Sequence, residues 1–493
     1  MPLIQSFSGI RGIYDDSLNE KVAVRYAYSY LSLLKNKYNN KSNVKNYYGK
    51  KLKIVIGTDT RPSRDIIKNA VFEAVDCDII DVGIASTPMT EFAVRYFKAN
   101  GGIIITASHN EPYWNGFKFL DNDGVVLRPN DMEKVIKKYG SIKKINNETV
   151  LNKHLYKNKN TKDIKIKKVL ENQRFSAPMK WVYKKYNEIN NAYSDYVINF
   201  LSKEDKDKIK SSKLKIIIDP NGGTGVIAKT ILEKLNVKVH GINMKHGIFN
   251  RTVEPNEDSL LYLSNEVKDK NYDFAAGFDC DADRVEIVTS KGLISGNRLL
   301  ALIADEILKN TKNKVVVVND ATSLIVRETA KKHKAKYIET QVGEINVVDK
   351  MYELKAPIGG EGSSSGVIIP PSKCRDGILT IVYLLKTISN NKKSIDKLVN
   401  SLPQYYNIKT KINISSKKYN AIKKKLMDHY KKKNCRIKDS KAGSLKVYLN
   451  TNEFVWFRVS KTEANIVRII ADSPSKKKAE LITKEALNLV KNK

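Results

Sequence analysis

An apolar segment that runs directly into three alternating aspartates, at residues 277–284, constrains this chain most strongly. The run GFDCDADR places Asp279, Asp281 and Asp283 beside Arg284, directly after the strand-like stretch YDFAAGF. In an extended segment alternate side chains project to the same side, so we expect the three carboxylates to converge. Clustered negative charges repel unless a cation lies between them, and all-oxygen ligands without His or Cys suit Mg²⁺. A solvated acidic turn is the alternative explanation.

A second segment, residues 101–119, combines an apolar strand with a serine at its end. The strand leads into ASHN, which places Ser108 at a junction between strand and loop. Lys118 lies between Phe117 and Phe119, so partial burial would lower its pKa and suit it to proton transfer. The alternatives are that Ser108 only caps a turn and that Lys118 is a surface residue of an alternating strand.

Two further segments have the residue types that bind hydroxyl and phosphate groups. IGGEGSSSGVII (358–369) predicts an ordered strand–loop–strand connection in which Glu361 accepts two hydroxyl hydrogen bonds, or alternatively a flexible linker. In WFRVSKTEANIVRIIADS (456–473), Arg458, Ser460 and Thr462 alternate, so an arginine fork and two hydroxyls could hold a phosphate dianion. The alternative for this segment is the polar face of a half-buried strand.

Taken together and in this order, the segments resemble the α-D-phosphohexomutase superfamily, whose members interconvert sugar 1-phosphates and 6-phosphates. The resemblance covers nearly the whole chain and is carried by FSGIRG, IVIGTDTRPSR, STPMTEFAVRYF, ITASHN, the aspartate run, GEGSSSG and RVSKTEAN. TQVGEINVVDKM followed by IGGEGSSSGVIIP looks most like the archaeal-type phosphoglucosamine mutases. Archaeal phosphomannomutases and phosphoglucomutases look similar there and stay as alternatives.

The resemblance implies a role for each matching residue. It makes Ser108 the phosphoserine, which together with Asp279, Asp281 and Asp283 would bind one Mg²⁺ ion. It also implies a bisphosphorylated sugar as activator and intermediate. The other implied catalytic residues are Lys118 as general acid and base, His109 beside the reacting phosphate, and Arg11 and Arg284 for charge balance. The implied substrate-binding residues are Glu361, Ser363 and Ser365 in the sugar loop, and Arg458, Ser460, Thr462 and Asn465 in the phosphate loop.

The chain departs from the family pattern at several of these positions. Many relatives end the sugar loop with His, where this chain has Ser365, and this removes one contact to the sugar. Lys461 and Ala464 stand where the phosphate loop usually has Gly or Asn and Pro. Cys280 and Ala282 lie between the aspartates and leave the ligands intact.

The chain has 493 residues, so we expect several domains. Strand-like runs alternate with helical patterns, which is typical of α/β units. The resemblance implies a four-domain architecture: three α/β domains with mixed sheets flanked by helices, a smaller C-terminal α+β domain and a central cleft. We place domain I, with the phosphoserine loop, at 1–150 and domain II, with the metal loop, at 151–294. Domain III, with the sugar loop, spans 295–398, and domain IV, with the phosphate loop, spans 399–493.

Two segments outside the motifs also allow an interpretation. The Lys/Asn-rich residues 139–175 interrupt the alternation of strands and helices and are interpreted as a linker enlarged by an insertion. DPNGGTG (219–225) follows a strand, but it lacks the Lys-Ser/Thr pair of a P-loop and is interpreted as a structural turn.

The formal net charge of +35 would fit a protein that binds nucleic acid. The excess is mostly Lys spread along the chain and no nucleic-acid motif is visible, so we favour a codon bias and a small phosphosugar partner. No apolar run predicts a signal peptide or a membrane span. The four scattered cysteines indicate a reducing cytoplasm. We expect a monomer or a homodimer. A phosphatase that uses Ser108, and a non-catalytic nucleic-acid-binding relative, are the rival functions.

Overall fold

The computed structural model describes residues 2–39, 52–142, 182–440, 443–460 and 465–491. The chain divides into two compact units, Met1–Tyr193 and Ser194–Lys493. Most of the Lys/Asn-rich segment 139–175 lies outside the described residues, as do Lys461, Thr462 and Ala464. The predicted boundaries at 150, 294 and 398 stay predictions.

The first unit is a seven-stranded mixed sheet in the order β1-β2-β6-β5-β3-β4-β7. Its strands are β1 (Ile4–Ser6), β2 (Gly9–Ile13), β3 (Lys53–Thr58), β4 (Asp78–Ile84), β5 (Gly101–Ile105), β6 (Trp114–Leu120) and β7 (Val182–Lys184). β5, β3, β4 and β7 are parallel, whereas β1, β2 and β6 pair antiparallel. Its helices are α1 (Glu20–Asn39), α2 (Arg64–Ala74), α3 (Thr87–Tyr96) and α4 (Pro129–Ile142), and α7 (Tyr186–Ile198) runs across the division between the units.

Helices cover both faces of this first sheet. Ile54, Ile56, Ile103 and Ile105 alternate along β3 and β5 and pack with α1, α2 and α4 into one apolar core. Gly57, after Ile56, and Gly102, before Ile103, lie on the opposite face, where added Cβ atoms would meet Thr90 and Val94 of α3. The glycines therefore let α3 approach the sheet closely.

The second unit contains three sheets. The first has the order β12-β11-β10-β8-β9 and consists of β8 (Lys215–Asp219), β9 (Lys238–Gly241), β10 (Phe274–Phe278), β11 (Val285–Thr289) and β12 (Gly292–Ile294). The second has the order β14-β13-β15-β16 and consists of β13 (Val315–Asn319), β14 (Lys336–Thr340), β15 (Ile358–Glu361) and β16 (Gly366–Ile368). Both are mixed, with parallel β9-β8-β10 and β14-β13-β15 segments.

The helices that accompany these two sheets begin with α8 (Lys203–Ser212), α9 (Ile227–Lys234) and α10 (Glu257–Asp269). They continue with α11 (Gly296–Asn310), α12 (Leu324–Lys332), α13 (Glu344–Leu354), α14 (Gly377–Asn391) and α15 (Ile395–Asn400). Two short 3₁₀ turns, η2 (Thr224–Val226) and η3 (Gly362–Ser364), lie in the loops of interest below.

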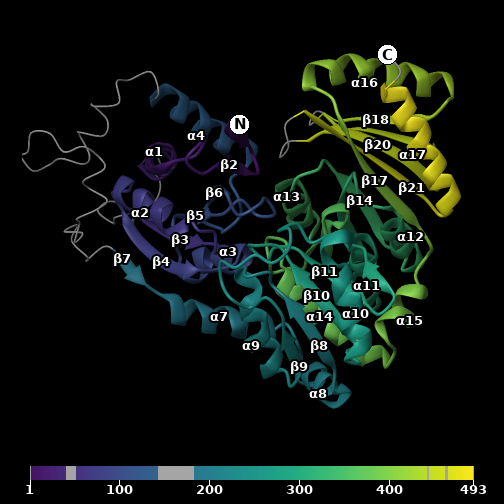
Figure 1. Cartoon of the computed structure of the whole chain (residues 1–493), viewed down its shortest axis with the longest axis horizontal. Helices are drawn as coiled ribbons and strands as arrows, with labels where there is room; N and C mark the ends of the chain where they lie inside the picture. Colours follow the sequence, from purple (N-terminus) through teal and green to yellow (C-terminus); the bar gives the residue numbers. More distant parts are fainter. Residues whose placement is uncertain (1, 40–51, 143–181, 441–442, 461–464, 492–493) are drawn as a thin grey trace, which may run out of the picture. The chain divides into compact units, whose positions relative to one another are not determined.

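The C-terminal sheet is antiparallel throughout, with the order β17-β21-β20-β19-β18. Its strands are β17 (Tyr406–Asn413), β18 (Arg436–Asp439), β19 (Leu445–Asn450), β20 (Glu453–Val459) and β21 (Ile466–Ser473). α16 (Ser416–Lys432) and α17 (Lys476–Lys491) pack on it around Tyr419, Tyr430, Phe457 and Ile469 (Figure 1). Three α/β parts with mixed sheets and a C-terminal α+β part confirm the predicted fold class.

Candidate active site

The loop that carries Ser108 begins where β5 ends, and a buried arginine fixes its backbone. Ser108 is 1% exposed, has a left-handed backbone (φ +54°) and donates its N–H to Oγ1 of Thr106 at 2.8 Å. Arg61 is fully buried and donates to the carbonyl oxygens of Ser108 at 2.7 Å and Trp114 at 3.1 Å. Nε of Arg61 lies 2.9 Å from Oδ2 of Asp59. This paired guanidinium therefore holds the serine loop in one conformation.

Sequence reasoning gave Arg61 no role, although its segment TDTRPSR belongs to the resemblance. The signal was present in the order of the strands. β3 and β5 are parallel neighbours with Thr58 opposite Ile105, so the residues that follow both strands meet at one sheet edge. Arg61, in the loop that follows β3, is thereby brought to the serine loop.

The other implied residues of the first unit lie on neighbouring strands. Nη1 of Arg11, on β2, donates to Oδ1 of Asn110 at 2.8 Å, so Arg11 lies beside the serine loop. His109 lies next to Ser108 in this loop and is half-buried. Lys118, on β6, is 7% exposed and donates to Oγ1 of Thr87 at 3.1 Å.

The burial expected for Lys118 is confirmed, but the reason we gave for it is wrong. Phe117 and Phe119 belong to the core on the side of α1, and strand alternation turns Lys118 to the opposite face. There Lys118 is buried against Thr87 at the start of α3, rather than between the two phenylalanine rings.

The three aspartates converge in the second unit, as predicted. Asp279, Asp281 and Asp283 are at most 1% exposed and each offers an oxygen within 4.8 Å of the others. Nε of Arg284 lies 3.8 Å from Asp279 and 3.7 Å from Asp283. A solvated acidic turn does not explain three buried carboxylates. This donor set fits a hard divalent cation.

The backbone that brings the aspartates together differs from the expected extended strand. The run turns tightly after β10, with Ala282 at φ +52° and its N–H bound to the carbonyl of Asp279 at 3.2 Å. The carboxylates therefore converge because the chain reverses direction in residues 279–284, between β10 and the antiparallel β11.

The DPNGGTG segment supports this metal turn, which confirms the interpretation as a structural turn. Thr224 donates both its N–H (2.8 Å) and its hydroxyl (3.1 Å) to the carbonyl of Cys280. Arg251, to which sequence reasoning gave no role, is ion-paired with Asp219 and donates to the carbonyl of Phe278 at 2.7 Å. The carbonyl groups beside Asp279 are thus held from two directions.

The GEGSSSG loop joins β15 to the antiparallel β16, as predicted, and its acid is firmly held. Glu361 is 4% exposed and accepts at Oε1 from Asn319 and from the N–H of Gly343, both at 2.9 Å. Its Oε2 accepts from Nη1 of Arg375 at 3.0 Å. Glu361 therefore has less free acceptor capacity than the two hydroxyl contacts that the sequence predicted.

Arg375 also binds the metal turn. Its Nη2 donates to Oδ2 of Asp283 at 2.6 Å, and its Nε lies 2.9 Å from Oε2 of Glu344. The metal turn and the sugar loop are therefore joined through one guanidinium. Sequence reasoning missed Arg375, whose only local signal is an Arg-Asp-Gly run before the apolar α14.

The end of the sugar loop is bound to neighbouring sheets. Ser365, at φ +58°, donates its hydroxyl to Oε1 of Glu286 on β11, and Nζ of Lys409 on β17 donates to the carbonyl of Ser363 at 2.6 Å. Burial raises the pKa of Glu286 to about 7, against the opposing effects of the Ser365 hydroxyl and Lys409. Burial also lowers the pKa of Lys409, although Glu286 opposes this shift.

The predicted phosphate loop lies between β20 and β21. Arg458 near the end of β20 is 8% exposed, and burial lowers its pKa, although Asp320 and Glu361 oppose this shift. Ser460 follows β20 and binds Ile466 backbone to backbone at 2.7 Å. Asn465 is exposed, with φ +56°. The expected common face of Arg458, Ser460 and Thr462 stays a prediction, since Thr462 lies outside the described residues.

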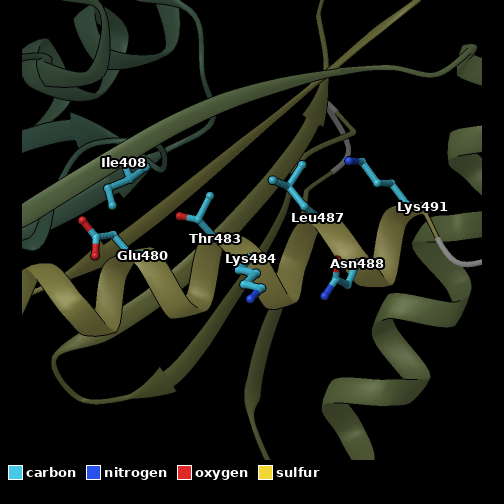
Figure 2. Close-up of a pocket in the computed structure, with 7 residues that line it drawn as sticks. All are labelled: Ile408, Glu480, Thr483, Lys484, Leu487, Asn488 and Lys491. Atoms are coloured by element: carbon cyan, nitrogen blue, oxygen red, sulfur yellow. The ribbon is translucent and has the colours of Figure 1, made fainter.

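A hollow of about 350 Å³ lies elsewhere on the C-terminal part, between α17 and β17 (Figure 2). Ile408, Glu480, Thr483, Lys484, Leu487, Asn488 and Lys491 line it. None of the predicted site residues is among them, so this hollow is not part of the candidate site.

Family models decide the superfamily. The models described as phosphoglucomutase/phosphomannomutase alpha/beta/alpha domains I, II and III match residues 4–146, 191–292 and 295–406. The chain belongs to the phosphohexomutase superfamily. It is accordingly a phosphohexomutase, an isomerase, as the resemblance indicated.

Relatives and solved structures agree with this placement. The chain is 29% identical to a phosphoglucomutase/phosphomannomutase from Thermococcus kodakarensis, over 96% of this chain and 94% of that protein. It is 26% identical to a phosphoglucosamine/phosphogalactosamine mutase from Sulfurisphaera tokodaii, over 98% of both. The open form of the phosphoglucomutase parafusin from Paramecium has the same fold, with a TM-score of 0.76 at 18% identity over 99% of this phosphohexomutase and 94% of parafusin. Among the described residues, no helix has the length and apolar character to cross a bilayer.

Proposed function

We propose that this phosphohexomutase interconverts glucosamine 6-phosphate and glucosamine 1-phosphate through phosphorylated Ser108 and a bisphosphorylated sugar. The observation that carries the proposal is the buried triad Asp279, Asp281 and Asp283, joined through Arg375 to the sugar-loop acid Glu361. In this proposal, the triad binds the cation and Glu361 binds sugar hydroxyls close to it. Phosphoryl transfer between sugar hydroxyls needs both.

The triad would hold one Mg²⁺, because its donors are three buried oxygens that already repel one another. When bound, Mg²⁺ neutralises phosphate oxygens and polarises the phosphoryl group. Arg284, whose Nε is close to Asp279 and Asp283, balances part of the negative charge of the turn. Arg11, beside the serine loop, does the same for the Ser108 phosphate in our proposal.

The transfer step uses Ser108 and Lys118. The bond from phosphorus to Oγ of Ser108 breaks as a new bond forms to the free sugar hydroxyl oxygen, and Lys118 carries the hydroxyl proton to the departing Oγ. After the bisphosphate turns over, Lys118 takes the proton back from Oγ of Ser108 as Oγ accepts the phosphoryl group from the other end, and Lys118 returns the proton to the departing sugar oxygen. Lys118 suits this role because an amino group that has lost its proton can accept one and return it later.

The phosphate that does not react would be held by Arg458, Ser460 and Asn465, together with Thr462. This loop has to accept either end of the sugar, because the intermediate turns over between the two transfers. An arginine fork with hydroxyl and amide donors suits this task, since it grips a phosphate without reading the ester attached to it.

The sugar itself is the finer part of the proposal. The segment TQVGEINVVDKM and the GEGSSSG loop look most like phosphoglucosamine mutases, and the relative from Sulfurisphaera tokodaii has that activity in its name. The second candidate is a phosphomannomutase/phosphoglucomutase, the name of the relative from Thermococcus kodakarensis. Coupled assays with glucosamine, mannose and glucose 6-phosphates, each with Mg²⁺ and its bisphosphate, separate the two. We expect the highest kcat/KM with glucosamine 6-phosphate, and a higher value with mannose or glucose 6-phosphate would reject this assignment.

The rival functions make different products. A phosphatase would release inorganic phosphate, and a non-catalytic nucleic-acid-binding relative would bind DNA in a salt-sensitive way without any turnover. Isomer formation without free phosphate supports the mutase. The cytoplasmic location and the monomeric or homodimeric state stay predictions.

A further inference from the structure

Arg375 is a buried residue outside the predicted site, and it contacts three carboxylates from three different elements. Its side chain is 10% exposed. Asp283 belongs to the metal turn after β10, Glu361 ends β15 and Glu344 begins α13. The distances from the guanidinium nitrogens to these carboxylates are 2.6, 3.0 and 2.9 Å.

The absence of a side chain at Gly366 leaves room for the side chain of Arg375. A Cβ atom added to Gly366, the first residue of β16, would lie 2.0 Å from Cδ of Arg375. The backbone N–H of Arg375 also donates to Oε2 of Glu344 at 3.0 Å, so both ends of the residue are fixed by one carboxylate. The guanidinium therefore has little freedom to turn.

The contacts of Arg375 set the orientation of the two functional acids. Each carboxylate oxygen has two lone pairs. Oε1 of Glu361 already accepts two hydrogen bonds and Oε2 accepts one, from Arg375. One acceptor direction on Oε2 thus remains for a sugar hydroxyl, and Arg375 decides where it points. By binding Oδ2 of Asp283, the same guanidinium also fixes the rotation of a metal ligand.

We propose that Arg375 is a positioning residue that couples cation binding at the aspartate triad to sugar binding by Glu361. The inference rests on the proposed function. A guanidinium suits this role because its rigid fork presents several donors in fixed directions, whereas a lysine is a single point charge. Partners of this kind orient metal ligands, and their loss typically weakens metal binding.

The test uses Arg375→Lys and Glu344→Gln in the full-length protein. Arg375→Lys keeps the positive charge but removes the planar guanidinium. Glu344→Gln removes the negative charge that lies 2.9 Å from Nε of Arg375 and leaves Asp283 and Glu361 unchanged. Lys386→Met is the matched control, because Lys386 lies on α14, the helix that follows Arg375, and its ion pair with Asp205 of α8 (2.9 Å) is remote from the triad. Circular dichroism checks the fold of each variant. Electron paramagnetic resonance measures Mn²⁺ binding, and calorimetry measures glucosamine 6-phosphate binding.

We expect Arg375→Lys to raise the dissociation constants of both Mn²⁺ and glucosamine 6-phosphate by about tenfold or more. Glu344→Gln should raise both constants by a smaller factor, and Lys386→Met should change neither. A folded Arg375→Lys protein that binds Mn²⁺ like the wild type, or that loses only one of the two affinities, overturns the coupling. If Arg375→Lys does not fold, unchanged constants in Glu344→Gln overturn it.

Turnover of the wild type tests the proposed function separately. If the wild type isomerises no sugar phosphate while Arg375→Lys still weakens Mn²⁺ binding, the proposed function fails but the role of Arg375 at the triad remains. If the wild type isomerises glucosamine 6-phosphate and both constants are unchanged in the two variants, the proposed function stands and the role of Arg375 fails.

Discussion

Ser365, at the end of the sugar loop, donates its hydroxyl to the buried carboxyl group of Glu286 on β11. Burial raises the pKa of Glu286 to about 7 from the ordinary 4.5. The groups that act on this carboxyl group are Ser365, Lys409, Arg284 and Glu254. The loop that would bind the sugar is therefore attached to a group that titrates near neutral pH.

Glu286 makes stability depend on pH in a defined direction. Because its pKa is higher in the folded than in the unfolded protein, the folded state gains stability from the protonated form. This contribution is complete below about pH 4.5 and is lost as pH rises to about 7, by up to about 3 kcal/mol. Glutamine cannot ionise, so the melting temperature of Glu286→Gln should not show this loss. We expect the difference in melting temperature, Glu286→Gln minus wild type, to increase from pH 5 to pH 8.

A substitution of the neighbouring Lys409 provides a second test of this prediction. Lys409→Met removes a positive charge that favours the ionised carboxylate, so the pH-dependent loss of stability should move to higher pH. Melting temperatures of the three proteins that change in parallel from pH 5 to pH 8 would contradict the role given to Glu286.

Ser108→Ala should abolish most turnover of glucosamine 6-phosphate, even with the bisphosphate activator supplied, because no other hydroxyl would accept and return the phosphoryl group. Ser141→Ala, on the exposed side of α4, is the control and should retain wild-type kcat. The coupled assay checks both. Normal mutase activity of the Ser108→Ala protein would refute the assignment of the phosphoserine.

Removal of the divalent cation should stop the reaction. We expect chelation with EDTA to abolish turnover and added Mg²⁺ to restore it, because the triad would otherwise repel the phosphate. Asp281→Asn removes one ligand charge and should shift the Mg²⁺ dependence of the rate to higher concentrations, whereas the exposed Asp258→Asn on α10 should not. Full activity in EDTA would contradict the metal site.

Arg61 should matter for both stability and activity. Arg61→Met leaves the buried Asp59 without its guanidinium and the carbonyl of Ser108 without its donor. Losing one partner of a buried ion pair costs about 3 to 5 kcal/mol, so we expect a lower melting temperature and loss of turnover. Arg64→Met, whose partner Asp65 is largely exposed, should be nearly neutral. A stable and active Arg61→Met protein would show that the serine loop does not depend on this residue.

Arg458→Lys should separate substrate binding from chemistry. Lysine keeps the charge but makes only a single contact to the phosphate, so we expect KM to rise by about tenfold with a smaller effect on kcat. Arg436→Lys, in the same sheet and stacked on Tyr448, is the matched control. Steady-state kinetics with glucosamine 6-phosphate measure both, and an unchanged KM in Arg458→Lys would remove Arg458 from the phosphate loop.

Local patterns predicted the strand before the aspartates, the convergence of Asp279, Asp281 and Asp283, and the strand–loop–strand form around Glu361. They failed where the backbone departs from a regular element. The positive φ of Ala282 makes a tight turn of a run that we expected to be extended. Lys118 faces α3 rather than the two phenylalanine rings, a fact that depends on which face of the sheet each helix covers.

The residues that sequence reasoning missed act over long separations. Arg375 binds Asp283 from 92 residues away, and Glu286, which was not predicted, accepts a hydrogen bond from Ser365 across 79 residues. A local pattern contains no information about such pairs, because the packing of separate sheets decides them. The convergence of the three carboxylates was predictable, and the contact between Arg375 and Asp283 was not.

Transfer of a labelled phosphoryl group in a single turnover tests the central claim most directly. Protein labelled with ³²P at Ser108, as located by peptide mapping, is mixed with unlabelled glucosamine 6-phosphate and Mg²⁺. The account predicts that the label leaves Ser108 and is found in the sugar bisphosphate and in glucosamine 1-phosphate. Label that stays on the protein, or that appears only as inorganic phosphate, would contradict it.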